Sequence, residues 1–274
     1  MRGLRHWLLA VQFFTRIPVT GRLAAWVGYS PAMLRASAAH FPSIGWLAAG
    51  LAAAVWWALS TVLGAQAGTP LVAAVGATVA TILMTGGFHE DGLADVADGL
   101  GGSYDRERAL DIMKDSRVGA FGAMALQLAL LAKVALLAWL GHSGLSNTLA
   151  ALLLGHVLSR FWPLILVRRL PHVGDTARSK SKPLADQISA GALVVAGLWC
   201  LPPLALCAWA FGPVFVGAAL LGSAALARAD ILMRQRQRVL HIVPLRRRPM
   251  RTSTISAFGP ANEPDCRCFN CRPT

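Results

Sequence analysis

Charged side chains are scarce in this sequence. Lys, Arg, Asp and Glu together make up 14% of its 274 residues, whereas an average soluble domain has about 25%. Hydrophobic residues make up 55%. A folded domain of this size must cover its core with polar side chains wherever its surface meets water. The composition therefore excludes an ordinary soluble enzyme and predicts that lipid covers much of the surface.

Acidic residues are the scarcer charged group, with 13 Asp and Glu against 26 Lys and Arg, and the formal net charge is +13. The excess is unevenly distributed. Ten arginines and three acids between Arg228 and Arg272 give that segment a charge of +7 and leave +6 for the preceding 227 residues. Because the total is dominated by the tail, it does not predict a nucleic-acid partner. The sequence leaves open whether the chain forms a homo-oligomer.

Long stretches without charge predict an all-α integral membrane protein. A helix needs about 20 apolar residues to cross about 30 Å of hydrocarbon. Turn signals at 64–70 and 141–147 divide the two longest stretches. The sequence thus predicts a polytopic helical bundle with about six transmembrane helices, at residues 44–63, 70–86, 119–140, 147–167, 188–209 and 212–228.

The segments between the predicted spans differ in charge from one side to the other. Cytoplasmic segments of membrane proteins are enriched in Lys and Arg, so both termini are predicted to be cytoplasmic, together with an acidic loop at 87–118. Trp7–Phe14 is apolar behind Arg2 and Arg5, which predicts an interfacial helix. The turns on the opposite side contain no charged residue, at 64–69, 141–146 and 210–211.

Eight of the thirteen acids fall between Glu90 and Asp115. Asp91, Asp95 and Asp98 have i, i+4, i+7 spacing, which places them on one face of a helix. Their negative charges repel one another unless a cation binds them. Oxygen ligands favour Mg²⁺, Mn²⁺ or Ca²⁺ over zinc, and the spacing of an EF-hand is absent. The three aspartates are therefore predicted to bind a divalent metal, with Mg²⁺ suiting a catalytic site.

The remaining acids of this segment have basic neighbours. Asp105, Glu107 and Asp111 alternate with Arg and Lys, which favours ion pairs on a solvated helix face. Ser103 is predicted to cap the helix that follows it. Cations beside a carboxylate-bound metal suit a polyphosphate substrate. The segment thus predicts phosphoryl transfer, and the absence of a G-x-x-x-x-G-K motif argues against an NTPase motor.

Two cations, Lys133 and Arg160, lie inside predicted spans. Such residues usually face the interior of a bundle or a polar cavity, although Lys133 is equally placed to extend to the membrane surface. The rival interpretation of the whole chain is a cation-binding membrane transporter whose acidic loop is a cytoplasmic gate.

Two long motifs carry a family resemblance. The sequences HEDGLADVADG at His89–Gly99 and IMKDSRVGAFG at Ile112–Gly122 resemble the signature of the cobalamin synthase, or adenosylcobinamide-GDP ribazoletransferase, family. TRIP at Thr15–Pro18 and FPSIG at Phe41–Gly45 are similar to its amino-terminal motifs. The resemblance implies a multi-pass bacterial inner-membrane enzyme of vitamin B12 synthesis. It would transfer a cobinamide phosphoryl group from adenosylcobinamide-GDP to α-ribazole or its 5′-phosphate, with Mg²⁺ as cofactor and GMP as leaving group.

The same resemblance implies roles for individual residues. Asp91, Asp95 and Asp98 would hold the metal, with Asp91 and Asp95 acting directly in catalysis. His89 or Glu90 would accept the proton of the attacking hydroxyl. Substrate phosphates would be contacted by Arg16, Lys114, Arg117, Lys133 and Arg160.

The end of the chain departs from the family pattern. The family continues with a T-G-D-x-L-G-A motif and a further span, whereas residues 234–274 are rich in Arg and Pro. We expect a membrane-embedded catalytic domain at 1–233 and an atypical basic tail at 234–274 that is disordered or out of frame. Part of the family's expected site is then missing, so the resemblance alone does not establish that this chain is active.

Overall fold

The computed structural model describes residues 2–169, 188–225 and 228, and its regular secondary structure is entirely helical. The chain divides into Met1–Met233 and Arg234–Thr274, and all helices described below belong to the first unit. The prediction for the tail at 234–274 lies outside the described residues.

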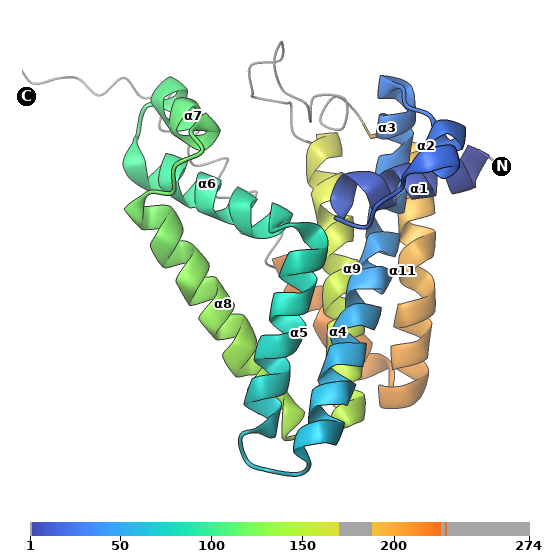
Figure 1. Ribbon diagram of the computed structural model, residues 1–274, viewed down its shortest axis with the longest axis vertical. Coiled ribbons are helices and arrows are strands. Elements are labelled where there is room, and N and C mark those ends of the chain that lie inside the picture. The colour runs from blue at the N-terminus through green and yellow to red at the C-terminus, as the bar shows by residue number, and fades with distance from the viewer. Residues whose placement is uncertain (1, 170–187, 226–227, 229–274) are drawn as a thin grey trace, which may run out of the picture. The chain divides into compact units, whose positions relative to one another are not determined.

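Five long helices form the bundle, and contacts between them define its core. α4 packs on both α5 and α9, α9 packs on α11, and α8 packs mainly on α5 and α6. Figure 1 shows α4, α9 and α11 side by side, with α8 slanting away from them. These helices are α4 (Phe41–Leu63), α5 (Thr69–Thr85), α8 (Ala120–Gly141), α9 (Leu145–Arg169) and α11 (Ala190–Phe211).

The all-α membrane fold predicted from the sequence is confirmed. Four helices are long and apolar enough to cross a membrane, and a fifth span results if α5 and the helix after it are counted together. The predicted span at 212–228 corresponds to a shorter apolar helix, Pro213–Ala225.

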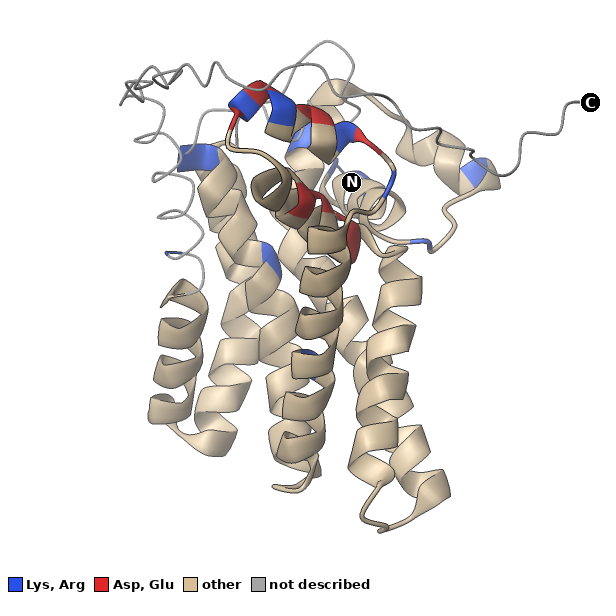
Figure 2. Cartoon of the chain, turned by 90° about the vertical axis from the view of Figure 1, so that its left-hand side faces the viewer, with Lys and Arg blue, Asp and Glu red and all other residues tan. Residues whose placement is uncertain are grey.

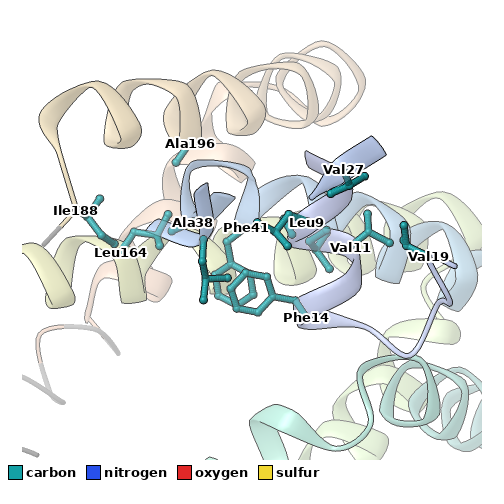
Figure 3. Packing of buried hydrophobic residues seen from close by; sticks show 13 residues of the cluster. Leu9, Val11, Phe14, Val19, Val27, Ala38, Phe41, Leu164, Ile188 and Ala196 are labelled. Atoms are coloured by element: carbon teal, nitrogen blue, oxygen red, sulfur yellow. The ribbon is translucent and has the colours of Figure 1, made fainter. Parts of the chain in front are cut away.

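The amino-terminal segment forms three short helices across one end of the bundle (Figure 1). The predicted helix at Trp7–Phe14 is confirmed as part of α1. Its buried face carries Leu9, Val11 and Phe14, which pack with Phe41 of α4 (Figure 3). Val11 and Phe14 lie three residues apart and therefore share one side of the helix. The three helices are α1 (Arg2–Phe14), α2 (Gly21–Val27) and α3 (Pro31–Ser37).

A sharp bend after α5 turns the acidic segment across the end of the bundle. Gly86 and Gly87 have φ of 66° and 72°, a left-handed conformation that glycine adopts without a steric penalty. The next helix, α6 (Phe88–Gly102), lies at 87° to α5. The α6 helix therefore runs across the end of the bundle and not along the membrane-spanning helices. The predicted acidic loop consists largely of α6 and α7 (Arg106–Lys114).

The cap of α7 differs from the prediction. Asp105, not Ser103, is the N-cap, and its Oδ1 accepts a hydrogen bond of 2.9 Å from the Arg108 N–H. Ser103 follows the end of α6, and its Oγ accepts a hydrogen bond from the Asp105 N–H. The Asp105 carboxylate reaches the third residue of the helix, which is the usual reach of an N-cap side chain. Ser103 lies too early in the chain for that contact.

The closest approach between α4 and α9 depends on Gly45. A Cβ atom placed there would lie 2.5 Å from the carbonyl oxygen of His156 and 2.7 Å from the Cα of Val157. Since both obstacles are backbone atoms, a side chain can be accommodated only if the helices separate.

We predict that Gly45→Ala lowers the free energy of unfolding by about 1–3 kcal/mol, the usual cost of overpacking a core. Thermal unfolding in detergent measures this. Gly50→Ala is the matched control on the same helix, because nothing lies within 4 Å of a Cβ at Gly50. Equal unfolding temperatures for the two variants would contradict the tight contact.

Candidate active site

The charges of the described residues are concentrated at one end of the bundle. All eight of their Asp and Glu residues lie between Glu90 and Asp115, on or beside α6 and α7. Figure 2 shows these acids together with several cations at that end, above helices that are otherwise almost free of charge. The candidate site is therefore the end of the bundle that α6 covers.

Asp91 and Asp95 form a carboxylate pair on α6, one helical turn apart. Asp91 is exposed and Asp95 is partly exposed. Partial burial, together with the charges of Asp91 and Asp98, raises the pKa of Asp95 above its ordinary value. A cation bound between Asp91 and Asp95 would relieve this repulsion.

Asp98 has a different environment from that pair. Its side chain is buried, and its two oxygens accept hydrogen bonds of 2.7 Å each from the N–H groups of Gly119 and Gly122. A carboxylate at a helix N-terminus satisfies N–H groups that have no partner within the helix and interacts favourably with the helix dipole. Asp98 thus joins α6 to the first turn of α8.

The residues fit a metal held by two carboxylates. Within the described ranges, no three Asp, Glu, His or Cys side chains are grouped so that they could hold an ion. Mg²⁺ commonly takes one or two protein carboxylates and completes its shell with water and substrate phosphates. Asp91 and Asp95 satisfy that requirement. That Asp98 is a third metal ligand stays a prediction. Both oxygens of Asp98 already accept hydrogen bonds from backbone N–H groups.

His89 lies on an aromatic surface made by two phenylalanines. Its ring stacks on Phe41, with ring centres 6.0 Å apart and planes 4° from parallel, and meets Phe88 edge-on. The His89 side chain is exposed, yet the atoms around it desolvate the imidazole, and this desolvation and then the nearby charges of Arg160 and Lys133 lower its pKa well below the ordinary value. The imidazole is therefore neutral near pH 7 and is able to accept a proton.

A polar cluster lies beneath the start of α6. Arg160 is only 3% exposed, and its guanidinium donates a hydrogen bond of 2.7 Å to the carbonyl oxygen of His156. Glu90 lies near enough for its charge to act on both Arg160 and Lys133. The buried Oε2 of Glu90 and the Nε of Arg160 have no hydrogen-bond partner among the described residues. Two cations, Arg160 and Lys133, therefore lie near a single carboxylate, that of Glu90, at the start of α6.

Sequence reasoning assigned no role to Phe41 or His156. The Cζ of Arg160 lies 5.9 Å from the centre of the Phe41 ring, so Phe41 contacts both Arg160 and His89. The signals were present but weak. Phe41 opens the FPSIG motif, and His156 precedes Arg160 by four residues, which places them on one helix face.

The other predicted phosphate-binding residues lie at two ends of α6. Arg16 lies at the bend before α6, where its N–H donates a 2.7 Å hydrogen bond to the Met84 carbonyl oxygen and its guanidinium lies against Gly86. Arg117 follows α7 at the far end and forms a 2.6 Å ion pair with Asp115. The hydrogen bonds from Arg117 lower the pKa of Asp115 to about 2.

Lys114, the last residue of α7, is exposed on the same far side. A helix of 15 residues such as α6 is about 22 Å long. The arrangement therefore brings Arg16, Lys133 and Arg160 toward one end of α6 and leaves Lys114 and Arg117 at the other.

Comparison with known proteins identifies relatives along most of this first unit. The sequence profile described as cobalamin-5-phosphate synthase matches residues 6–239. The adenosylcobinamide-GDP ribazoletransferase of Polaromonas naphthalenivorans is 64% identical over 226 residues, covering 78% of this chain and 81% of that protein. The protein of the same name from Leptothrix cholodnii is 48% identical over 210 residues, covering 76% of this chain and 75% of that protein.

A third relative of that name, from Albidiferax ferrireducens, is 65% identical over 203 residues, covering 74% of this chain and 72% of that protein. No solved structure matches the chain. The profile match includes the whole of α6, α7 and α8 and most of α1. The chain therefore belongs to the cobalamin-5-phosphate synthase family and is a transferase of cobalamin synthesis.

Proposed function

We propose that this chain transfers the cobinamide phosphoryl group of adenosylcobinamide-GDP to α-ribazole or α-ribazole 5′-phosphate in the bacterial inner membrane. The products are GMP and adenosylcobalamin or its 5′-phosphate. The reaction takes place at the cytoplasmic membrane face, with both termini on that side and Mg²⁺ as cofactor.

The carboxylate pair on α6 carries this proposal. Asp91 and Asp95 lie on the same helix as Glu90, whose charge acts on Lys133 and Arg160, and the Arg16 guanidinium lies against Gly86 just before that helix. A diphosphate ester needs both a divalent ion and nearby cations, because the negative charge on its oxygens must be offset during transfer. The names of the relatives supply the identity of the diphosphate.

The reaction forms one bond and breaks one. The 3′-hydroxyl oxygen of the ribazole ribose attacks the phosphorus attached to cobinamide, and the bond from that phosphorus to the bridging oxygen breaks, releasing GMP. His89 or Glu90 accepts the hydroxyl proton. Asp91 and Asp95 would hold a Mg²⁺ ion, which would offset the charge of the diphosphate. Arg16 and Arg160 orient phosphate oxygens of the diphosphate, Lys133 contacts a substrate phosphate, and Lys114 and Arg117 contact more distant parts of the donor.

The transporter interpretation has less support. Transport sites are usually built near the middle of the membrane on interrupted helices. Here the acids lie on α6, across the end of the bundle, and the relatives are named as transferases. We therefore do not propose an ion gate.

Incubation of the purified chain with adenosylcobinamide-GDP, α-ribazole 5′-phosphate and Mg²⁺ tests the reaction. We expect chromatography to detect GMP and the joined corrinoid in equal amounts. A chelator should abolish both products, and added Mg²⁺ should restore them. Absence of GMP from a folded chain would overturn the proposed function.

Asp91→Asn and Asp95→Asn should each lower the rate of product formation by about a hundredfold or more, because loss of a metal-bound charge costs several kcal/mol of transition-state stabilisation. The unfolding temperature should remain close to that of the unchanged chain, since these side chains lie toward solvent. Product formation by either variant within about threefold of the unchanged chain would contradict the metal assignment.

Asp98→Asn should instead destabilise the fold. The amide can offer only one acceptor oxygen where two N–H groups converge, so one buried N–H loses its partner at a cost of about 1–3 kcal/mol. Thermal unfolding of Asp98→Asn and Asp91→Asn, measured side by side, separates the two roles. Equal unfolding temperatures would show that Asp98 does not hold α8 in place.

A further inference from the structure

A cavity of about 300 Å³ lies between α8 and α9. The two helices follow one another in the chain but touch only slightly, because α8 packs on α5 and α6 and slants away from α9 (Figure 1). Gly122 is the only buried residue of α8. The cavity is therefore bounded by one side of α8 and by the facing side of α9.

The lining changes from polar to apolar along the cavity. α8 begins beside α6 and runs away from it, so Lys133 lies nearer to α6 than Leu137 does. α9 runs back, so His156 and Ser159 lie nearer to α6 than Leu152 does. All five residues line the cavity. Its end toward α6 thus carries a cation, an imidazole and a hydroxyl, and its deeper end is hydrocarbon.

The charges around the cavity favour an anion. Lys133 and Arg160 lie within bundle helices, and among the described residues only the charge of Glu90 acts on them with opposite sign. Within the described ranges, neither cation has a carboxylate oxygen within 4 Å. A lysine in an apolar helix is costly unless it faces a polar space or a partner. Here Lys133 faces the cavity, where a bound anion would offset its charge.

Small side chains keep the space open. Ala151, Gly155 and Ser159 follow one another at intervals of four residues on α9, and all three line the cavity. Nothing lies within 4 Å of a Cβ placed at Gly155. Glycine at this position is therefore not required by helix packing, and a larger side chain there would extend into the cavity.

We propose that this cavity binds the acceptor nucleoside, which combines an apolar aromatic base with a ribose that carries hydroxyls or a phosphate. The base lies against Leu137 and Leu152, and the ribose and its 5′-phosphate lie at Lys133 and Ser159. The acceptor hydroxyl is thereby held on the side of the cavity that faces α6. The proposal rests on the proposed function, because it assigns one of the two substrates of that reaction.

Gly155→Leu tests the apolar part of the site. In lipid nanodiscs, we expect the dissociation constant of α-ribazole 5′-phosphate, measured by calorimetry, to rise about tenfold or more as the leucine fills the cavity. The KM for adenosylcobinamide-GDP should stay within about twofold. Gly50→Leu on α4 is the matched control, since it too adds a side chain where a Cβ meets nothing within 4 Å, and it should leave acceptor binding unchanged.

Lys133→Met tests the polar end. The substitution removes a charge from an apolar helix and so should not impair folding. We expect binding of α-ribazole 5′-phosphate to weaken about tenfold and binding of unphosphorylated α-ribazole to weaken much less, because a charged contact to phosphate is lost. The measurements are repeated in nanodiscs with and without anionic lipid, which distinguishes the acceptor phosphate from a lipid phosphate.

Unchanged acceptor binding in folded Gly155→Leu would overturn the cavity assignment, as would a rise in the KM of the donor alone. A Lys133→Met effect that disappears without anionic lipid would also overturn it. The proposed function and the cavity assignment can fail separately. If the unchanged chain binds the acceptor but forms no GMP, the proposed function is overturned and the cavity assignment stands. If Gly155→Leu turns over normally, the reaction stands and the cavity assignment is overturned.

Discussion

The two hydrogen bonds from the first turn of α8 to the Asp98 carboxylate fix the candidate site. α6 leaves α5 at 87°, through two glycines in a left-handed conformation, and glycine hinges restrict direction poorly by themselves. The Asp98 contact ties the other end of α6 to α8 across 21 and 24 residues of sequence. Figure 1 shows the resulting triangle of α5, α6 and α8. Because the lower part of α8 packs on α5, the orientation of α6 is fixed at both ends.

This connection explains why three evenly spaced aspartates have different environments. Asp98 lies only about 20° around the helix from Asp91 but about 10 Å further along its axis, where it meets the first turn of α8, while Asp91 and Asp95 stay toward solvent. Burial of Asp98 is offset by backbone N–H groups and the α8 dipole. Asp91 and Asp95 have no such compensation, and the raised pKa of Asp95 is a consequence. One acidic helix thus provides both a structural anchor and a carboxylate pair for an ion.

The sequence predicted the helices well because hydrophobicity and turn residues are local signals. The predicted span at 119–140 is observed as Ala120–Gly141, and 188–209 as Ala190–Phe211. Helical spacing also placed Asp91 and Asp95 correctly on one helix. It did not reveal that Gly119 and Gly122 bond to Asp98, or that Phe41 stacks on His89, because periodicity identifies the face of a helix but not what covers it. Those partners are set by the bend at Gly86 and Gly87, whose direction the sequence does not encode locally.

The same geometry connects the anchor to the cavity. A helix that packed along α9 for its full length would bury Lys133 against apolar side chains, at a cost that membrane helices avoid. Holding the start of α8 on Asp98, away from α9, leaves room beside Lys133 while the rest of α8 still packs on α5. The open side of α8 is thus a direct result of where α6 ends. The hydrogen bonds that join Asp98 to α8 therefore also determine the size of the cavity between α8 and α9, in which we propose that a substrate binds.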